Sequence, residues 1–365
     1  MVKSVLNKNN YIFLPFLALL IILAVIYPSQ IKDYPEFVDW NTIAVLIGLL
    51  ITTTAIKESS FFIKIAERVI YKIDDERKLA ITLITMSSLL SMLFTNDIAL
   101  FIVVPLTLAL QSYLKNNIQK LVIFEAISVN VGAALTPIGS PQNLYLWHQW
   151  DISFINFVIN MFPLFIFLFA VLIIFGVAVF PSKKLSIKEL DRVTVLNKNL
   201  FYLSTFLLLL CIIAVEQNFT FLALAVIFLI YLFFSRNILS KVDWLLIVLF
   251  IIMFIDFHIL SQIPFVSNFI ARFDLNEPKS IFTLSFFSAQ VFSNVPASIF
   301  ISKFSNDWFA IAYGVNIGGN GFIIGSLANI IALRFINSKK IWVDFHKYSI
   351  PYFIVTAISS YFIFF

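Results

Sequence analysis

Two short polar clusters interrupt apolar stretches of this sequence and contain its best candidates for chemistry. Thr95-Asn96-Asp97 divides the apolar region 79–113, and Ser293-Asn294-Val295-Pro296 divides the region 281–306. Amide, hydroxyl and carbonyl oxygens of this kind suit a small hard cation such as sodium. The N–H groups at the start of a helix attract anions instead. The clusters therefore indicate ion binding.

Two further segments, 130–143 and 316–329, combine Asn and Ser with several Gly and Pro residues inside apolar surroundings. Such residues can merely kink a membrane helix, but non-helical backbone that lines a cavity has the same composition. Each segment accompanies one polar cluster, which favours an unwound helix at a binding site. The candidate substrate-binding residues are Thr95, Asn96, Asn130, Gly132, Thr136, Gly139, Ser140, Asn143, Ser293, Asn294, Asn316, Gly318, Gly319, Asn320, Gly325 and Ser326.

The candidates for binding a coupling ion are Asp97, Asn96 and Asn294, and a bound sodium ion would use Thr95, Asn96 and Gly132. A carboxylate taken out of water favours its neutral form unless a cation lies beside it, so Asp97 is either a proton carrier or a cation ligand. Alternatively, Asp97 only caps the helix that follows it. Because neither cluster contains Lys or Arg, an anion would be held by backbone N–H groups, hydroxyls, amides and co-bound cations.

Three other ionisable residues lie in apolar segments and have simpler interpretations. Asp256 and His258 end the apolar run 243–260, and we expect them to be solvated near the membrane surface. Glu125 begins a predicted broken helix, where a carboxylate favours the helix dipole, so we interpret it as structural.

The composition identifies the elements that must position these residues as membrane helices. The chain has 365 residues, of which 61% are hydrophobic and 12% charged, with a mean hydropathy of +0.96. A soluble domain has about 25% charged residues. We therefore predict an all-α polytopic membrane protein in the lipid bilayer. Despite a net charge of +5, nucleic acid is not an expected partner, because the basic residues are scattered over short loops.

The apolar segments predict about nine full crossings and two re-entrant hairpins, at 79–113 and 281–306. The arms of these hairpins are short for a hydrocarbon core of about 30 Å. The first run, 11–27, lacks a small-residue cleavage pattern at its end, so we interpret it as a retained helix and not as a signal peptide. With a cytoplasmic N-terminus, all but four of the 25 Lys and Arg residues face the cytoplasm, as expected in a plasma membrane. Two ordinary crossings in place of a hairpin would give the same distribution.

Three pieces of the first half recur in the second in the same order. Val38-Asp39-Trp40 matches Val242-Asp243-Trp244, and the two polar clusters correspond to each other. The segments 129–143 and 315–329 are identical at seven of 15 positions. The predicted topology gives the two halves opposite orientations, an arrangement that recurs in transporters. The predicted domains are a first inverted repeat at 1–180, a linker with an extra crossing at 181–218, and a second inverted repeat at 219–365.

Phe94-Thr95-Asn96-Asp97 and the segment Thr136–Asn143 resemble the first-half motifs of citrate-transporter-like permeases of the ion transporter superfamily. This group includes arsenite permeases, sodium/proton antiporters and divalent-anion:sodium symporters. Ser293–Pro296 and Gly318–Asn329 are similar to the second-half motifs, especially those of arsenite permeases. The resemblance implies two hairpins, two broken helices, and often a homodimer with an elevator-like movement. The first tip reads Thr-Asn-Asp where the symporters have Ser-Asn-Thr, and the second half lacks their Thr-Pro-Pro-Asn pattern, so proton coupling rivals sodium coupling.

Together these observations predict a secondary active transporter for a small inorganic or organic anion, coupled to protons or sodium. A sodium/proton antiporter of the same fold is the main alternative. An intramembrane enzyme is disfavoured, because the chain has no His-Glu-x-x-His and no Gly-x-Ser-x-Gly. A primary pump would need a partner subunit, since no ATP-binding loop is present. No cofactor is expected apart from a bound sodium ion.

Overall fold

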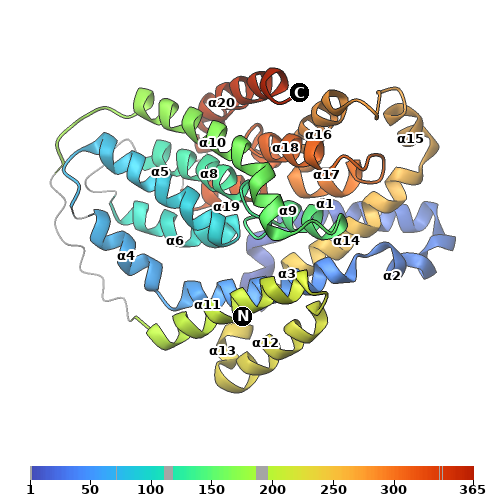
Figure 1. Ribbon diagram of the computed structural model, residues 1–365, viewed down its shortest axis with the longest axis horizontal. Helices are drawn as coiled ribbons and strands as arrows, with labels where there is room; N and C mark the ends of the chain where they lie inside the picture. The colour runs from blue at the N-terminus through green and yellow to red at the C-terminus, as the bar shows by residue number, and fades with distance from the viewer. Residues whose placement is uncertain (1, 71, 111–117, 186–195, 337, 339) are drawn as a thin grey trace.

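The computed structural model describes residues 2–70, 72–110, 118–185, 196–336, 338 and 340–365, the first eleven of them by their backbone only. In this part of the chain the elements are α-helices and short 3-10 helices, and the only β-type pairing is an isolated bridge between Asp75 and Lys184. The structure is therefore all-α, as the composition predicts (Figure 1).

The first half contains hairpin helices and a broken helix in the predicted order. Its elements are α1 (Val2–Ile26), η1 (Pro28–Asp33), α2 (Tyr34–Phe37), α3 (Trp40–Glu58), α4 (Phe61–Ile70), α5 (Glu76–Leu93), α6 (Asn96–Ala109), α8 (Ile118–Ala133), α9 (Pro141–Gln149) and α10 (Phe154–Val179). The predicted linker contains α11 (Lys198–Glu216). The last residues of the predicted first hairpin, 111–113, and the linker residues 186–195 lie outside the described part.

The second half repeats this order of elements. It consists of α12 (Thr220–Phe234), α13 (Arg236–Leu239), α14 (Trp244–Gln262), α15 (Pro264–Ile270), α16 (Pro278–Phe292), α17 (Asn294–Ile301), α18 (Trp308–Gly318), η3 (Ile323–Gly325), α19 (Leu327–Arg334) and α20 (Ile341–Ile363). The helices α5 and α6 pack against each other, as do α16 and α17, so each predicted hairpin region forms two helices joined at its polar cluster.

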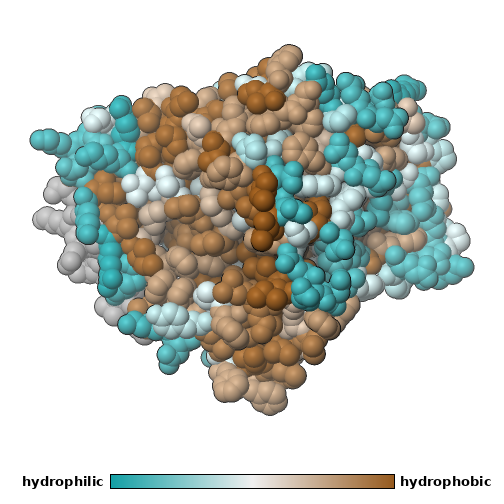
Figure 2. Space-filling model, in the orientation of Figure 1, coloured by the Kyte–Doolittle hydropathy of each residue, from teal (hydrophilic) through white to brown (hydrophobic). Residues whose placement is uncertain are grey.

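A polytopic membrane protein is consistent with both the helices and the surface. By length and composition, α3, α10, α11 and α14 can each cross a membrane, and α1 with the bent segment Pro28–Phe37 gives a fifth candidate. This is fewer than the nine crossings expected, because α12 has only 15 residues, the two broken helices are divided into short parts, and α20 is not among the helices apolar enough to cross. Figure 2 shows a broad hydrophobic band between two hydrophilic ends of the molecule.

The repeated Val-Asp-Trp sequence forms the same local structure twice. Asp39 accepts a hydrogen bond from the backbone N–H of Thr42 at 3.1 Å, and Asp243 accepts one from that of Leu246 at 3.3 Å. Each Asp thereby caps the first turn of the following helix. The Trp40 and Trp244 indole N–H groups each donate to the carbonyl five residues earlier, both at 2.8 Å. The two repeats therefore begin α3 and α14 in the same way.

Close packing of helices places the broken helices against the hairpins. In both repeats, the broken helix lies against the first hairpin helix: α8 against α5, and α18 against α16. A Cβ on Gly132 would lie 2.1 Å from the Ser88 carbonyl oxygen, and one on Gly318 would lie 2.6 Å from the Ala289 Cβ. Glycine at these positions permits the close helix contact, as small residues commonly do in membranes.

Helices of each repeat pack against helices of the other repeat. The first helix of each repeat packs on the capped helix of the other, so that α1 contacts α14 and α12 contacts α3. The second part of each broken helix also packs on the other repeat: α19 contacts α6 and α8, and α9 contacts α17 and α18. In Figure 1, α3 and α14 accordingly lie near each other and α9 lies between the two halves. Residues from both repeats thus meet in the centre.

Candidate functional site

The breaks in the two broken helices bring polar backbone groups into the interior. The helix α8 ends at Ala133 and α9 begins at Pro141, while α18 ends at Gly318 and α19 begins at Leu327. The backbone between these ends is non-helical apart from the short η3. Ends of helices have C=O and N–H groups without partners inside the helix. A polar environment at both breaks is therefore required, as the composition of 130–143 and 316–329 predicts.

Two reciprocal asparagine pairs join the breaks of the two repeats. The side-chain amide of Asn130 donates to the Asn329 side-chain oxygen at 3.0 Å, and that of Asn316 donates to the Asn143 oxygen at 2.7 Å. Asn130 and Asn316 occupy corresponding positions of the repeats, as do Asn143 and Asn329. All four side chains are buried. The pairs therefore relate the two halves by an approximate two-fold arrangement.

The amide nitrogens of Asn143 and Asn329 form hydrogen bonds with carbonyl groups at the breaks. Asn143 donates to the Ala133 carbonyl at 2.9 Å, and Asn329 donates to the Gly319 carbonyl at 2.9 Å. Ala133 and Gly319 are again corresponding positions. An unpaired carbonyl at this depth would cost several kcal/mol. Part of the role of these asparagines is thus to stabilise the breaks themselves.

The tip of the first hairpin is attached to both breaks through Asn96. Its backbone N–H donates to the Gly139 carbonyl at 2.9 Å, and its side-chain amide donates to the Asn130 oxygen at 3.3 Å. The same Asn130 oxygen accepts a hydrogen bond from the Ser326 hydroxyl at 2.9 Å. The Asn130 side chain therefore connects the first tip, the first break and the second break.

The second tip is also near its break. Ser293 has a φ of 82°, which allows the sharp change of direction before α17. The amide nitrogen of Asn294 is buried without a hydrogen-bond partner, and a Cβ on Gly319 would lie 3.1 Å from it. Asn294 consequently faces the second break but leaves its donor unused.

Several buried polar atoms at the tips and breaks have no partner in the protein. They are Thr95 Oγ1, Asp97 Oδ1, Ser140 Oγ, Gln142 Oε1, Asn294 Nδ2 and Asn320 Oδ1. A buried unsatisfied polar group costs about 1–3 kcal/mol, and such groups in proteins call for a specific explanation. Their concentration at the two tips and two breaks, with both donors and acceptors present, is what a binding site for a small polar solute requires.

A cavity beside this cluster contains two carboxylates. Its lining includes Asp97 of α6, Asp243 at the start of α14, and Leu327 of α19, together with Phe13 and Leu246. Asp97 follows Asn96 in sequence and Leu327 follows Ser326, so the cavity borders the asparagine cluster. The side chain of Asp97 makes no capping hydrogen bond, since the N-cap of α6 is Thr95. The structure therefore does not support a capping role for Asp97.

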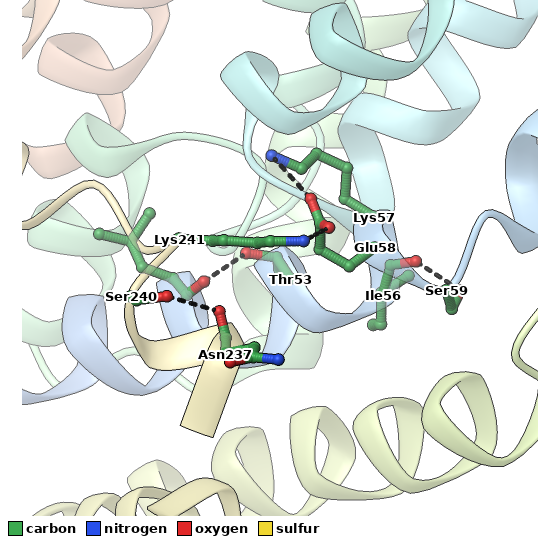
Figure 3. Close-up of polar contacts among 9 residues, drawn as sticks. Thr53, Ile56, Lys57, Glu58, Ser59, Asn237, Ser240 and Lys241 are labelled. Atoms are coloured by element: carbon green, nitrogen blue, oxygen red, sulfur yellow. Dashed lines mark hydrogen bonds and ion pairs between the residues drawn. The ribbon is translucent and has the colours of Figure 1, made fainter. Parts of the chain in front are cut away.

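Charged side chains of the two repeats contact each other at the end of α3 (Figure 3). At the end of α3, the Glu58 carboxylate pairs with Lys241, which precedes α14. The same carboxylate lies 3.7 Å from the Lys57 ammonium group. The Lys57 ammonium group is 5.2 Å from the ring centre of Phe101, one turn after Asp97 on α6. The two polar clusters contain no cation, and Lys57 contacts α6 from a separate helix.

The remaining predicted residues surround the cluster in packing roles. The Thr136 hydroxyl donates to the Met92 carbonyl at 2.7 Å. A Cβ on Gly139 would lie 2.7 Å from the Ala133 carbonyl oxygen, and one on Gly325 would lie 2.6 Å from that of Gly318. At these two positions only glycine allows the chain to fold back on the helix end.

The predicted sodium ligands are only partly available to an ion. Thr95 Oγ1 has no partner, but the Asn96 oxygen already accepts a hydrogen bond from the Asp97 N–H at 3.0 Å. The Gly132 carbonyl accepts one from the Leu135 N–H at 3.1 Å. In the described residues, no group of three or more His, Cys, Asp and Glu side chains could hold a metal ion. Thr95 and Asp97 are the candidates that retain free oxygen atoms.

Sequence reasoning missed two residues at the centre, Gln142 and Asn329. Gln142 donates to the Asn316 oxygen at 3.3 Å, and Asn329 completes one of the asparagine pairs. The repeat contained a signal for Asn329, because it is the counterpart of the predicted residue Asn143. Gln142 has no such signal, since its counterpart is Ala328.

The prediction that Asp256 is solvated was wrong. Its side chain is fully buried, and neither carboxylate oxygen has a hydrogen-bond partner. The segment before α3 covers this end of α14, where Phe37 stacks on His258 with 3.9 Å between ring centres. The expectation that Glu125 begins a broken helix was also wrong, because Glu125 lies in the middle of α8 and cannot interact with the dipole at its start. Glu125 is buried and accepts a hydrogen bond from the Thr107 hydroxyl.

Comparison with known proteins places this chain in a family of transporters. Residues 4–306 match the model of the citrate transporter family. The chain is 34% identical over 335 residues to the inner membrane protein YbiR of Escherichia coli, covering 92% of this chain and 90% of the relative. It is 35% identical over 339 residues to an uncharacterized transporter of Methanocaldococcus jannaschii, covering 91% of each. A silicon efflux transporter of rice, LSI3 of Oryza sativa subsp. japonica, is 24% identical over 143 residues, which are 39% of this chain and 30% of the relative. The chain therefore belongs to the citrate transporter family and is an integral membrane transporter, not an enzyme.

Proposed function

We propose that the protein is a secondary active transporter that moves a small inorganic or organic anion across the plasma membrane, coupled to protons or sodium. The observation that carries this proposal is the arrangement of the two breaks and two tips around reciprocal asparagine pairs, with partnerless polar atoms beside them. A site shared by two related halves can be exposed alternately to either side when the halves exchange conformations.

The composition of the site supports a solute rich in oxygen atoms. The partnerless hydroxyl of Ser140 and the amide of Asn294 can donate to such a solute, and the starts of α6 and α9 supply backbone N–H groups. The family is named for citrate, and one relative is named a silicon efflux transporter. Small oxygen-containing acids are thus the solutes to test first.

Transport into proteoliposomes tests this function directly. Labelled citrate, succinate, sulfate, arsenite and silicic acid would be supplied with an imposed sodium gradient, an imposed pH gradient, or neither. We expect accumulation of at least one solute that requires one of the gradients. Asn143→Ala should abolish it, because this variant removes both a pair and the contact that closes the first break, whereas Asn160→Ala on the exposed face of α10 should not. Accumulation that needs no gradient would contradict secondary active transport.

Asp97 is our candidate for the coupling residue, because its Oδ1 atom has no partner and its side chain lines the cavity beside the site. If Asp97 carries a proton, Asp97→Asn should abolish gradient-driven accumulation but retain solute exchange. If it binds sodium, the variant should still transport but require more sodium. Exposed Asp74 provides a matched control, Asp74→Asn. Wild-type behaviour of Asp97→Asn under every condition would exclude Asp97 from coupling.

A sodium/proton antiporter is the second candidate function, and the presence of both Asp97 and Asp243 in one cavity favours it. Two neighbouring carboxylates can exchange protons for a cation without any anionic solute. A pH-sensitive dye inside proteoliposomes distinguishes the two functions. Sodium-dependent proton movement in the absence of every tested anion would favour antiport over anion transport.

The proposed orientation has a cytoplasmic N-terminus. In a Cys211→Ala background, single cysteines replacing Lys78 and Lys279 would report the two sides through a membrane-impermeant reagent applied to intact cells. We expect labelling at position 279 only. Labelling at position 78 from outside would contradict the proposed topology.

A further inference from the structure

A basic cavity lies between the starts of α8 and α20, at the opposite end of α8 from Asn130 and the asparagine cluster. Its lining includes Lys120 of α8, Lys340 at the N-cap of α20, and Asp344, Lys347 and Tyr348 of α20. The two helices pack against each other here, and the ring centres of Phe124 and Tyr348 are 5.6 Å apart. The cavity is thus a defined space between two packed helices.

The charges of this cavity are not balanced within its lining. Asp344 forms an ion pair with Lys347 at 2.5 Å, while Lys120 and Lys340 form no ion pair with any described residue. The cavity also lies at the N-terminal ends of α8 and α20, which have 16 and 23 residues. Helix N-termini present free N–H groups and partial positive charge. The surplus positive charge favours an anion with several oxygen acceptors.

The neighbouring surface places this cavity at the boundary between lipid and water. Trp342 and Val343, in the first turn of α20, are 37% and 65% exposed, next to exposed Lys340 and Lys347. Tryptophan is enriched where the hydrocarbon meets the headgroups. An anion that reaches the lysines from this surface would have apolar chains beside Trp342 and Val343.

We propose that this cavity binds the phosphate group of an anionic phospholipid, with Lys120 and Lys340 contacting the phosphate and Asp344 limiting the affinity by retaining Lys347. Basic pockets between membrane helices commonly bind such headgroups. The site is separate from the transport site, so the inference does not depend on which solute is carried.

Native mass spectrometry of the detergent-purified protein tests this site, with dioleoyl-phosphatidylglycerol as the anionic lipid and dioleoyl-phosphatidylcholine as the neutral one. We expect tighter binding of the first phosphatidylglycerol than of phosphatidylcholine. The triple variant Lys120→Gln/Lys340→Gln/Lys347→Gln should weaken it at least about 25-fold, from a factor of about five for each of the two lysines that contact the phosphate. Replacement of the same lysines by Arg should keep affinity within about twofold.

Two further variants test whether phosphatidylglycerol affinity depends on the lysines of this cavity and not on surface charge in general. Asp344→Asn should bind phosphatidylglycerol about fivefold more tightly, because it releases Lys347 and removes a negative charge. The control Lys183→Gln/Lys184→Gln/Lys198→Gln removes the same charge from exposed positions outside the cavity and should leave affinity within about twofold. Equal losses in the control and the cavity variant would overturn the proposal. If the Gln variant does not fold, the Arg and Asp344→Asn variants still decide it, and failure of Asp344→Asn to tighten binding would count against it.

The source of the phosphate is distinguished by adding inorganic phosphate and glycerol 3-phosphate in place of lipid. We expect neither to compete with phosphatidylglycerol at millimolar concentration, because they lack the acyl chains. If inorganic phosphate binds in a lysine-dependent manner and phosphatidylglycerol does not, the cavity is a site for a free anion and the lipid proposal is wrong.

Discussion

Replacement of Asn130 by alanine removes the most connected side chain of the central cluster. Its amide donates to Asn329 and to the Gly319 carbonyl, and its oxygen accepts from Ser326 and Asn96. Hydrogen bonds between membrane helices contribute about 0.6 kcal/mol on average. Asn130→Ala should therefore lower the free energy of unfolding by about 2–3 kcal/mol.

A double-mutant cycle isolates the contact that joins the repeats. Asn329→Ala loses its hydrogen bonds to Asn130 and to the Gly319 carbonyl, which corresponds to about 1 kcal/mol. The Asn130→Ala/Asn329→Ala variant should lose about 0.6 kcal/mol less than the two single variants combined, because both remove the same hydrogen bond.

Steric trapping in bicelles measures these free energies for a membrane protein under native conditions. Asn160→Ala is the matched control, because Asn160 is exposed on α10 and its side chain bonds only within its own helix. The control should change stability by less than about 0.5 kcal/mol. If Asn130→Ala is no less stable than this control, or if the cycle shows no coupling, the reciprocal pairs do not hold the two halves together as we infer.

Three other predictions concern stability and can be checked by thermal denaturation in detergent. Gly132→Ala should destabilise the protein by about 1–3 kcal/mol, because its Cβ would overlap α5, whereas Gly48→Ala should cost less, since its Cβ meets only the Cys211 sulfur at 3.1 Å. Burial raises the pKa of Asp39, but hydrogen bonds from His148 and Thr42 outweigh it and hold that pKa below its ordinary value of 3.8. The ionised Asp39 therefore stabilises the fold above pH about 4, and this stabilisation is lost as pH falls through its lowered pKa. The stability of the Asp39→Asn variant should consequently decrease less than that of the wild type as pH is lowered. Lys241→Gln should cost less than about 1 kcal/mol, and high salt should remove the difference, because its ion pair with Glu58 is half exposed.

Much of the architecture follows from local sequence signals. The Val-Asp-Trp repeat marks the starts of α3 and α14, because Asp is strongly preferred as the residue that caps the first turn of a helix. The Gly- and Pro-rich segments mark the two breaks because several such residues occur close together there, whereas the single prolines Pro105 and Pro163 remain inside α6 and α10. The repeat even indicates which asparagines correspond, although it does not indicate that each one pairs with the other half.

Other features depend on packing that a single sequence does not encode locally. Asp256 is near the end of an apolar run, which suggests solvation, but η1 and α2 fold back over this end of α14 and bury it. Lys57 is distant in sequence from the first polar cluster, and its ammonium group lies over the Phe101 ring of α6 only because α3 and α6 pack together. Similarly, Gln142 gains its role from the partner Asn316 in the other repeat. The roles of these residues could be predicted only if the contacts between the helices were known.

The reciprocal asparagine pairs have a consequence for the ancestry of this chain. Each half contributes one member to each pair, so neither half alone can form the asparagine pairs. Two identical copies of a single half, related by a two-fold axis, would form the same two contacts. An ancestor half this length would form these contacts as a homodimer, and the predicted inverted topology would require its subunits to enter the membrane in opposite orientations. Fusion of the two genes would then have fixed that orientation and allowed positions such as Asp97 and Val295 to diverge.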